Sequence, residues 1–455
     1  MSMEDKITDV IIDELSFNNK RTASYIKDRQ EVIYNVIGSS TYSPTTQLTM
    51  NININGDMVL DQTTLRLNFK VTNTEAASHL LRPLTNGSGF LKRVRLLGKN
   101  GVVIHDIQDY GRYCEMMLLM ESKHHLDNYN LCGGFGDSIN SLQNDKNYGD
   151  LTQADIQDKY VHYIAGGQYK HVSIPLKLGL FMQSKFLLLR YLSNLTVEIT
   201  IDNVATNCVV SGMLTKASGT VGYVDTDHST SYIISDVNIS VDSLIMDSEF
   251  LNNFDSLLLE KNGQINYICD NVYHTVQTTG QTSALSLNIS RSFADLNSVF
   301  ISFYNRDRAD IANKVFWRRT NCFTRLNNDD ARLNISYNFN CNGKLYPPNP
   351  IVDNSSQFYN LLKAIGLNNS TYHSCAINRW SYGWENYILG FNFDKSLGVD
   401  SSGLNMINSI MQIQLKAYLR DESGRTASTL PQEVYILMCA KSKVVVKSTS
   451  VDVLD

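Results

Sequence analysis

The stretch that decides the fold is His171–Asp202, HVSIPLKLGLFMQSKFLLLRYLSNLTVEITID. Near its end Leu195, Val197, Ile199 and Ile201 alternate with polar side chains. In a β-strand successive side chains point to opposite faces, so this period of two gives one apolar and one polar face. The stretch therefore predicts a strand that buries one face and leaves the other in water.

The same alternation recurs in both halves of the chain. The further alternating runs are residues 65–71, 237–241, 285–289, 333–339 and 411–417. Polar turns separate these short runs, whereas a parallel α/β sheet needs a helix after almost every strand. The spacing predicts an all-β protein built as a sandwich or jelly roll.

Helices are scarce, and the two best candidates occupy matching places. One is predicted over residues 106–122, with Asp106 as its N-cap. The other follows a proline cluster, begins near Ser355 and is stopped by Gly366. Each helix lies late in its half with strands before and after it. We therefore predict two consecutive jelly-roll β-sandwiches, a double jelly roll, each with one short helix.

This order also predicts the domain boundaries. We expect an N-terminal arm at 1–30, a first jelly roll at 31–205, a linker or loop at 206–231 and a second jelly roll at 232–455. Gly212, Gly219 and Gly222, among Ser, Thr and Asp, mark the linker. The polar stretch Lys123–Gln168 lacks alternation and is predicted to be a surface loop that carries contacts.

Composition restricts the class of protein further. The 455 residues are 43% hydrophobic and 19% charged, as in a folded globular protein, and the net charge of −5 does not favour binding to phosphate or anionic lipid. Charged residues near the N-terminus argue against a signal peptide, and no apolar run reaches the length of a membrane span. The eight cysteines are scattered without a CxxC motif, which predicts reduced thiols in an intracellular setting.

Two groups of residues could suggest a ligand site. The glycine-rich segment 133–137 has no strand leading into it and no GKS or GKT, so a phosphate-binding loop is not predicted. His124, His125 and Cys132 lack a fourth metal ligand and a recognisable pairing, so a solvent-facing loop is the better interpretation.

Two further groups point to surfaces. Residues 316–319, FWRR, favour a protein interface or an intramolecular stack, since no wider basic field surrounds them. Lys441, Lys443 and Lys447 are predicted to be the wet face of a final strand. No Ser/His/Asp order, carboxylate pair or nucleophile elbow stands out. We therefore predict no catalytic, cofactor-binding or metal-binding residues, no cofactor and no enzymatic activity.

Several segments resemble one viral family. His171–Asp202 looks like the closing segment of the first jelly roll in double jelly-roll major capsid proteins. The other similar segments are Val36–Ser43, Gly343–Pro350 (GKLYPPNP) and Phe391–Asn405 (FNFDKSLGVDSSGLN). These are similar to the capsid proteins of polinton-like viruses, adintoviruses and virophages, and the resemblance spans residues 32–446. One departure is Leu189-Arg190-Tyr191-Leu192, where the family usually has Leu-Pro-Leu.

The resemblance implies a major capsid protein. It would form trimeric, pseudo-hexagonal capsomers that build an icosahedral shell around double-stranded DNA. The implied partners are further copies of the chain, neighbouring capsomers, penton and minor capsid proteins, and an internal membrane reached by the N-terminal arm, with no sequence-specific nucleic acid binding. The implied location is the virion, after synthesis in the host cytoplasm.

Two other interpretations stay open at this point. A viral or cellular carbohydrate-binding or receptor-binding β-sandwich protein would have a similar strand pattern. A jelly-roll enzyme of the cupin kind would need clustered histidines and a carboxylate as metal ligands, and the nine histidines do not form the HxH pattern.

Overall fold

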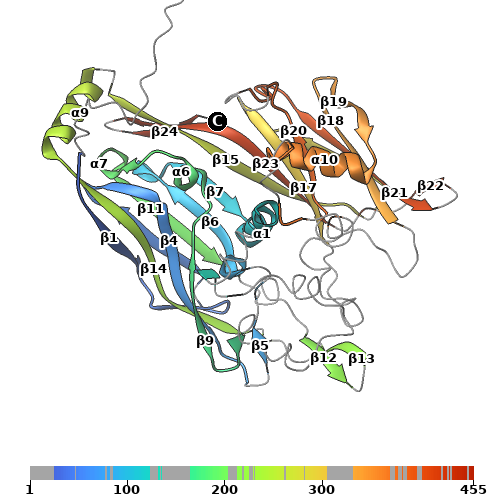
Figure 1. Cartoon of the computed structure of the whole chain (residues 1–455), viewed down its shortest axis with the longest axis horizontal. Helices are drawn as coiled ribbons and strands as arrows, with labels where there is room; N and C mark the ends of the chain where they lie inside the picture. The colour runs from blue at the N-terminus through green and yellow to red at the C-terminus, as the bar shows by residue number, and fades with distance from the viewer. Residues whose placement is uncertain are drawn as a thin grey trace, which may run out of the picture.

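The protein forms two β-sandwich bodies side by side, and the long strands β15 and β23 reach from one body across the other (Figure 1). The computed structural model describes residues 25–46, 48–76, 79–81, 83, 86–122, 132–133, 135, 164–202, 213–217, 220–224, 229, 231–260, 263–280, 282–304, 332–368, 375–377, 382, 387–396, 402–421, 424–427, 430, 433–447 and 450–454.

The first body contains eight strands in two sheets. These are β1 (Ile26–Ile37), β3 (Thr49–Asn55), β4 (Val59–Asn73), β6 (Leu91–Leu97), β7 (Val103–Gln108), β9 (Tyr169–Ile174), β11 (Asn194–Ile201) and β14 (Tyr232–Met246). One sheet has the order β9-β4-β14-β1 and the other β3-β11-β6-β7, and β1 joins them by pairing with β3 at Val36 and Ile37. When the eight strands are numbered along the chain, the first sheet contains the sixth, third, eighth and first strands, and the second sheet contains the second, seventh, fourth and fifth. This antiparallel order is that of a jelly roll.

The second body repeats this order strand for strand. Its strands are β15 (Gln264–Thr278), β16 (Ala284–Ile289), β17 (Leu296–Tyr304), β18 (Arg332–Cys341), β19 (Lys344–Ile351), β20 (Leu389–Asn392), β21 (Met411–Asp421) and β23 (Glu433–Lys447). The sheets are β15-β23-β17-β20 and β16-β21-β18-β19. The chain is therefore a double jelly roll, as predicted. We call the body from β1 to β14 roll 1 and the body from β15 onward roll 2.

Shorter elements connect and extend these strands. The helices are α1 (Tyr110–Met120), α6 (Gly179–Met182), α7 (Leu189–Leu192), α9 (Ser248–Glu260), α10 (Asn354–Ala364) and the 3₁₀ turns Gly87–Phe90 and Lys99–Gly101. The short strands are β2 (Thr41–Tyr42), β5 (Leu80–Leu81), β8 (Ile164–Ala165), β10 (Leu187–Leu188), β12 (Met213–Ala217), β13 (Thr220–Val224), β22 (Gly424–Ala427) and β24 (Val451–Leu454).

Both predicted helices exist, and each follows the fifth strand of its roll. The predicted cap of the first was wrong: Asp106 belongs to β7, where its carboxylate binds the Arg93 guanidinium, and Asp109 occupies the cap position. The second helix begins after Asp353 rather than at Ser355. It stops as predicted, because Gly366 has a φ of +75°.

The predicted boundary between the rolls was also wrong. β14 pairs with β1 on one side and with β4 on the other, and its Ile239 lies opposite Tyr34 of β1 and Leu67 of β4. Residues 232–246 therefore complete roll 1 instead of opening roll 2. His171–Asp202 holds the sixth and seventh strands and does not close the roll. Within the predicted linker, β12 and β13 form a hairpin between the seventh and eighth strands of roll 1. The connection between the rolls contains α9, which the sequence analysis did not predict. Residues 26–30 of the predicted arm are part of β1.

The alternating runs bury their apolar face as expected. Leu195, Val197, Ile199 and Ile201 are all buried, and the side chains between them are half-buried. Each fully buried Leu, Ile or Val contributes about 1.5–3 kcal/mol relative to an exposed one. Each roll therefore has its own apolar layer between its two sheets.

Candidate assembly surfaces

The two rolls share an interface built by the helices of roll 1 and the first sheet of roll 2. The Met116 sulfur of α1 lies 3.3 Å from the Ser302 hydroxyl of β17, and the Arg112 guanidinium lies 3.5 Å from the Glu433 carboxylate of β23. Close to α7, the Leu188 N–H donates to the Tyr267 hydroxyl of β15 at 3.2 Å. In Figure 1, α1 lies between the two rolls.

This interface explains a stretch that does not alternate. In β23 all residues from Val434 to Met438 are buried, because one face of the sheet packs inside roll 2 and the other packs against roll 1. Strands buried on both faces have near-continuous apolar sequences. The equivalent strand of roll 1, β14, instead places Asn238, Ser240 and Asp242 between buried aliphatic residues. The corresponding outer face of roll 1 is therefore polar.

One buried histidine links three elements across the interface. The His105 Nδ1 lies 2.7 Å from the Asn271 side-chain oxygen of β15, and its Nε2 accepts the Leu180 N–H of α6 at 2.9 Å. Because Nε2 accepts, Nδ1 carries the proton and donates to Asn271, so the ring is neutral. This imidazole fixes the position of α6 on β15.

A second histidine, half-buried in β15, lies beside charged groups of roll 1. The His274 Nε2 of β15 is 3.9 Å from the Asp109 carboxylate, which also binds the Lys92 ammonium, and the imidazole stacks on Tyr435 with ring centroids 5.4 Å apart. Burial lowers the pKa of His274, and Lys92 acts in the same direction, whereas Asp109 and Asp106 act against it. The neutral form is favoured at this position.

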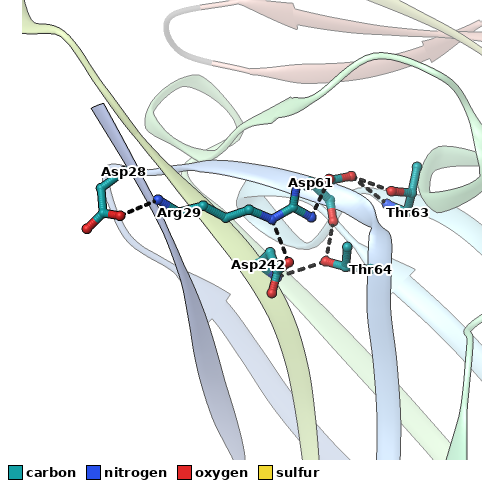
Figure 2. A network of polar contacts seen from close by, with 6 residues as sticks. All are labelled: Asp28, Arg29, Asp61, Thr63, Thr64 and Asp242. Atoms are coloured by element: carbon teal, nitrogen blue, oxygen red, sulfur yellow. Dashed lines mark hydrogen bonds and ion pairs between the residues drawn. The ribbon is translucent and has the colours of Figure 1, made fainter. Parts of the chain in front are cut away.

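The polar outer face of roll 1 contains a charged network that ties three strands together (Figure 2). The Arg29 guanidinium of β1 donates from Nε to Asp242 of β14 at 2.7 Å and from Nη2 to Asp61 of β4 at 2.8 Å. The Thr63 hydroxyl donates to Asp61 at 2.5 Å, and the Asp242 N–H donates to the Thr64 hydroxyl at 2.9 Å. The network lies at the edge of the sheet and holds β1 in register with its neighbours.

The candidate residues from the sequence fall in different places. Lys441, Lys443 and Lys447 lie in β23, where Lys441 and Lys443 are half-buried and Lys447 is exposed. Lys441 and Lys447 pair with Asp270 and Asp452 at 2.7 Å each, and β23 is followed by β24, so it is not the final strand. Gly133 packs against Asn86. The histidine pair at 124–125, residues 134, 136 and 137 of the glycine-rich segment, the FWRR segment and the N-terminal arm to residue 24 lie outside the described residues, as does most of the loop 123–168.

The described part of the chain contains no group of three or more His, Cys, Asp or Glu side chains placed to hold a metal ion. None of the helices described there is long and apolar enough to cross a membrane. Arg29 and His105 could not be recognised from the sequence, because a single Arg or His within an alternating strand looks like any other polar residue. The apolar run of β23, in contrast, is a visible sign of burial on both faces.

These features define a double jelly-roll protein. No family model matches the sequence, and no curated protein matches it. Three solved structures match along nearly the whole chain. The PBCV-1 virus capsid chain is 12% identical, and the match covers 97% of this chain and 100% of that chain with a TM-score of 0.60. The Faustovirus major capsid protein is 10% identical (95% of this chain and 92% of that chain, TM-score 0.59), and a chain of the Sputnik virophage is 12% identical (98% of this chain and 93% of that chain, TM-score 0.58). The chain thus has the double jelly-roll fold of viral capsid proteins.

Proposed function

We propose that this protein is a major capsid protein, a structural subunit that assembles into an icosahedral shell. The observation that carries the proposal is the match of both jelly rolls together, at nearly full length on both sides, to the PBCV-1 virus capsid chain and the Faustovirus major capsid protein, with a similar match to a chain of the Sputnik virophage. A protein with one sandwich domain and a binding site would have no need of the second roll.

The duplication supports a particular capsomer. Two rolls of the same order in one chain let three chains present six similar bodies, so a threefold ring has nearly sixfold outline. We propose a homotrimer of this kind, which packs beside neighbouring capsomers around double-stranded DNA. Penton and minor capsid proteins, and an internal membrane contacted by the N-terminal arm, are the further proposed partners.

The proposed role needs no catalysis. The interface between the rolls uses its buried His105 for structure, with both ring nitrogens engaged by protein atoms. The Arg29 network likewise binds its own carboxylates. We therefore propose a non-enzymatic protein, synthesised in the host cytoplasm and located in the virion, without sequence-specific nucleic acid binding.

Native mass and imaging test this proposal. Purified protein is examined by sedimentation velocity over a range of concentrations, and the same samples are imaged by negative-stain electron microscopy. The expected result is a particle of three chains with a hexagonal outline. A monomer that persists at high concentration contradicts the proposed capsomer.

Glycan-array binding provides the comparison with the other interpretation. Selective, saturable binding of a glycan by the monomer, without assembly, would support a carbohydrate-binding protein instead. Absence of such binding together with trimers leaves the capsid proposal standing.

A further inference from the structure

We propose that the interface between the two rolls contains an acid-sensitive latch, in which His105 of roll 1 holds α6 on β15 only while its imidazole is neutral. The latch consists of the His105 ring, the Asn271 side chain and the Leu180 N–H. Protonation of the ring is expected to release α6 from β15 while both rolls stay folded. The latch is a property of the single chain and goes beyond the proposed function.

The hydrogen bonds of Asn271 determine which nitrogen of His105 carries the proton. The Asn271 side-chain oxygen accepts the Val272 N–H at 2.9 Å, and the side-chain amide donates to the Tyr273 hydroxyl at 2.5 Å. The oxygen is therefore the atom that faces His105 Nδ1 at 2.7 Å. Because an amide oxygen only accepts hydrogen bonds, Nδ1 must be the protonated nitrogen.

The other nitrogen of the ring already has a donor. Leu180 is the second residue of α6, and the first N–H groups of a helix have no acceptor within the helix. His105 Nε2 accepts the Leu180 N–H at 2.9 Å. A proton on Nε2 would place two N–H groups head to head, so a charged ring cannot keep this bond. The neutral ring makes both contacts, whereas the charged ring makes only the contact with Asn271.

The ring is buried directly beneath α6. His105 and Asn271 are 2% and 3% exposed. An added Cβ at Gly179 of α6 would lie 3.1 Å from His105 Cε1 and 1.9 Å from the Asp270 carbonyl oxygen of β15. A charged ring at this position would lose its hydration without gaining an acceptor at Nε2. The second proton is therefore accommodated when α6 moves away and water reaches Nε2.

The carboxylates next to the latch bind cations of their own. Asp106 follows His105 in β7, where successive side chains point to opposite faces, and it binds Arg93 at 2.7 Å. Asp270 precedes Asn271 in β15 and pairs with Lys441 at 2.7 Å. Neither carboxylate is thus available to replace the bond that a protonated ring loses.

The remaining ionisable groups around the ring belong to β15 and to the approach to α6. The Cys269 sulfur of β15 lies 4.0 Å from His105 Nε2 and 3.8 Å from the Ser442 hydroxyl of β23. α6 itself has the sequence GLFM and contains no ionisable side chain. Lys177, just before α6, pairs with Glu121. None of these contacts gives a second proton on the ring an acceptor.

A second histidine of the same interface responds to acid in the same direction. His274 of β15 stacks on Tyr435 and lies 3.9 Å from the Asp109 carboxylate of roll 1. Burial lowers the pKa of His274, and Lys92 acts in the same direction, against Asp109 and Asp106. Opening the interface at His274 therefore also takes up a proton, although this residue is not part of the latch.

The number of protons taken up determines the size of the effect. A histidine released into water has a pKa of about 6.5. If opening takes up one proton, the protection factor of the Leu180 amide against hydrogen exchange falls as the pH drops below this value. The expected fall is about tenfold between pH 7.5 and 5.5 and about thirtyfold by pH 5.0. In the proposed capsid subunit, the latch would loosen the two rolls in an acidic compartment, and this use rests on the proposed function.

Hydrogen exchange of the full-length protein tests the latch. In His105→Gln the amide can still accept the Leu180 N–H but does not titrate, so the Leu180 protection factor is expected to stay constant from pH 7.5 to 5.0. His171→Gln is the matched control, because His171 is exposed on β9 of roll 1, and it should show the fall of the wild type. The Ile199 amide of β11, within roll 1, should keep its protection in all three proteins.

Asn271→Asp provides a second test that stays decisive if His105→Gln does not fold. A carboxylate beside Nδ1 favours the charged ring, so the fall in Leu180 protection should begin about one pH unit higher or more. An unchanged onset in this variant would count against the latch.

Equal Leu180 protection at pH 7.5 and 5.5 in the wild type, or the same fall in His105→Gln, would overturn the proposal. A parallel fall at Ile199 would also overturn it, because α6 would then open only when roll 1 unfolds. A chain that is monomeric at neutral pH contradicts the proposed capsomer and leaves the latch standing, so the two failures are distinguishable.

Discussion

The contact between α6 and β15 predicts the effect of one methyl group. In Gly179→Ala the added Cβ would lie 1.9 Å from the Asp270 carbonyl oxygen, whereas ordinary van der Waals contact begins at 3.4 Å, so the two segments must separate by 1.5 Å (3.4 − 1.9). Overpacking of this kind costs about 1–3 kcal/mol. The separation also strains the Leu180–His105 hydrogen bond, worth about 1 kcal/mol.

We therefore expect Gly179→Ala to lower the free energy of unfolding by about 2–4 kcal/mol. Urea unfolding at a fixed protein concentration measures this, and hydrogen exchange at the Leu180 amide reports whether the interface has opened. Gly280→Ala is the control, because Gly280 has a φ of +61° and no atom within 4 Å of an added Cβ. Its cost of about 1–2 kcal/mol comes from local backbone strain alone.

The predicted clash is contradicted if Gly179→Ala unfolds at the same urea concentration as the wild type and keeps the Leu180 amide protected. An equal loss in both glycine variants, without faster exchange at Leu180, would also count against a specific clash. Faster exchange at Leu180 in the Gly179 variant alone supports it.

Three further predictions concern individual side chains of the two rolls. Because the folded state lowers the pKa of His274, the contribution of this residue to folding stability is complete above pH 6.5 and is lost as the pH falls below it. Thermal unfolding measured from pH 8 to 5 should therefore show a smaller loss of stability in His274→Gln than in the wild type. Leu437→Ala should cost about 2–5 kcal/mol in urea unfolding, and Ser240→Ala at the polar counterpart sheet about 1, because it removes the hydrogen bond that Asn68 donates to the buried Ser240 hydroxyl. Iodoacetamide should label the exposed Cys132 well before Cys114, since burial raises the pKa of Cys114 to about 11.

Much of the fold could be predicted because its signals are local. An alternating run such as Leu195–Ile201 shows a strand with one buried face whatever strand it pairs with. The helices were predictable from their apolar spacing, and their matching places showed that the order is repeated. These features depend on residues close together in sequence.

The errors arose where the answer depends on distant pairing. β14 alternates as any half-buried strand does, so its sequence cannot show whether it pairs with β1 of roll 1 or with a strand of roll 2. α9 was not predicted, although the rings of its Phe250 and Phe254 stack with centroids 5.9 Å apart and the Phe250 ring centroid lies 4.8 Å from that of Tyr25. Its polar residues resemble those of a linker.

The candidate surfaces were the least predictable part. Ile33 and Ile37 resemble in sequence the less exposed Val32 and Val36 of β1, and their exposure follows from the register of that strand against β14 and β3. Ile407 and Ile410 lie in a connection with no periodicity.

The contrast between β23 and β14 follows from when each face is covered. The interface between the rolls forms within one chain, where the second roll is tethered beside the first and its effective concentration is high, so it can be apolar throughout. A face that waits for another chain stays in water during folding, and an apolar sheet there would expose a patch prone to aggregation. The polar face of β14 is therefore the form that a sheet face should take when no second roll of the same chain covers it.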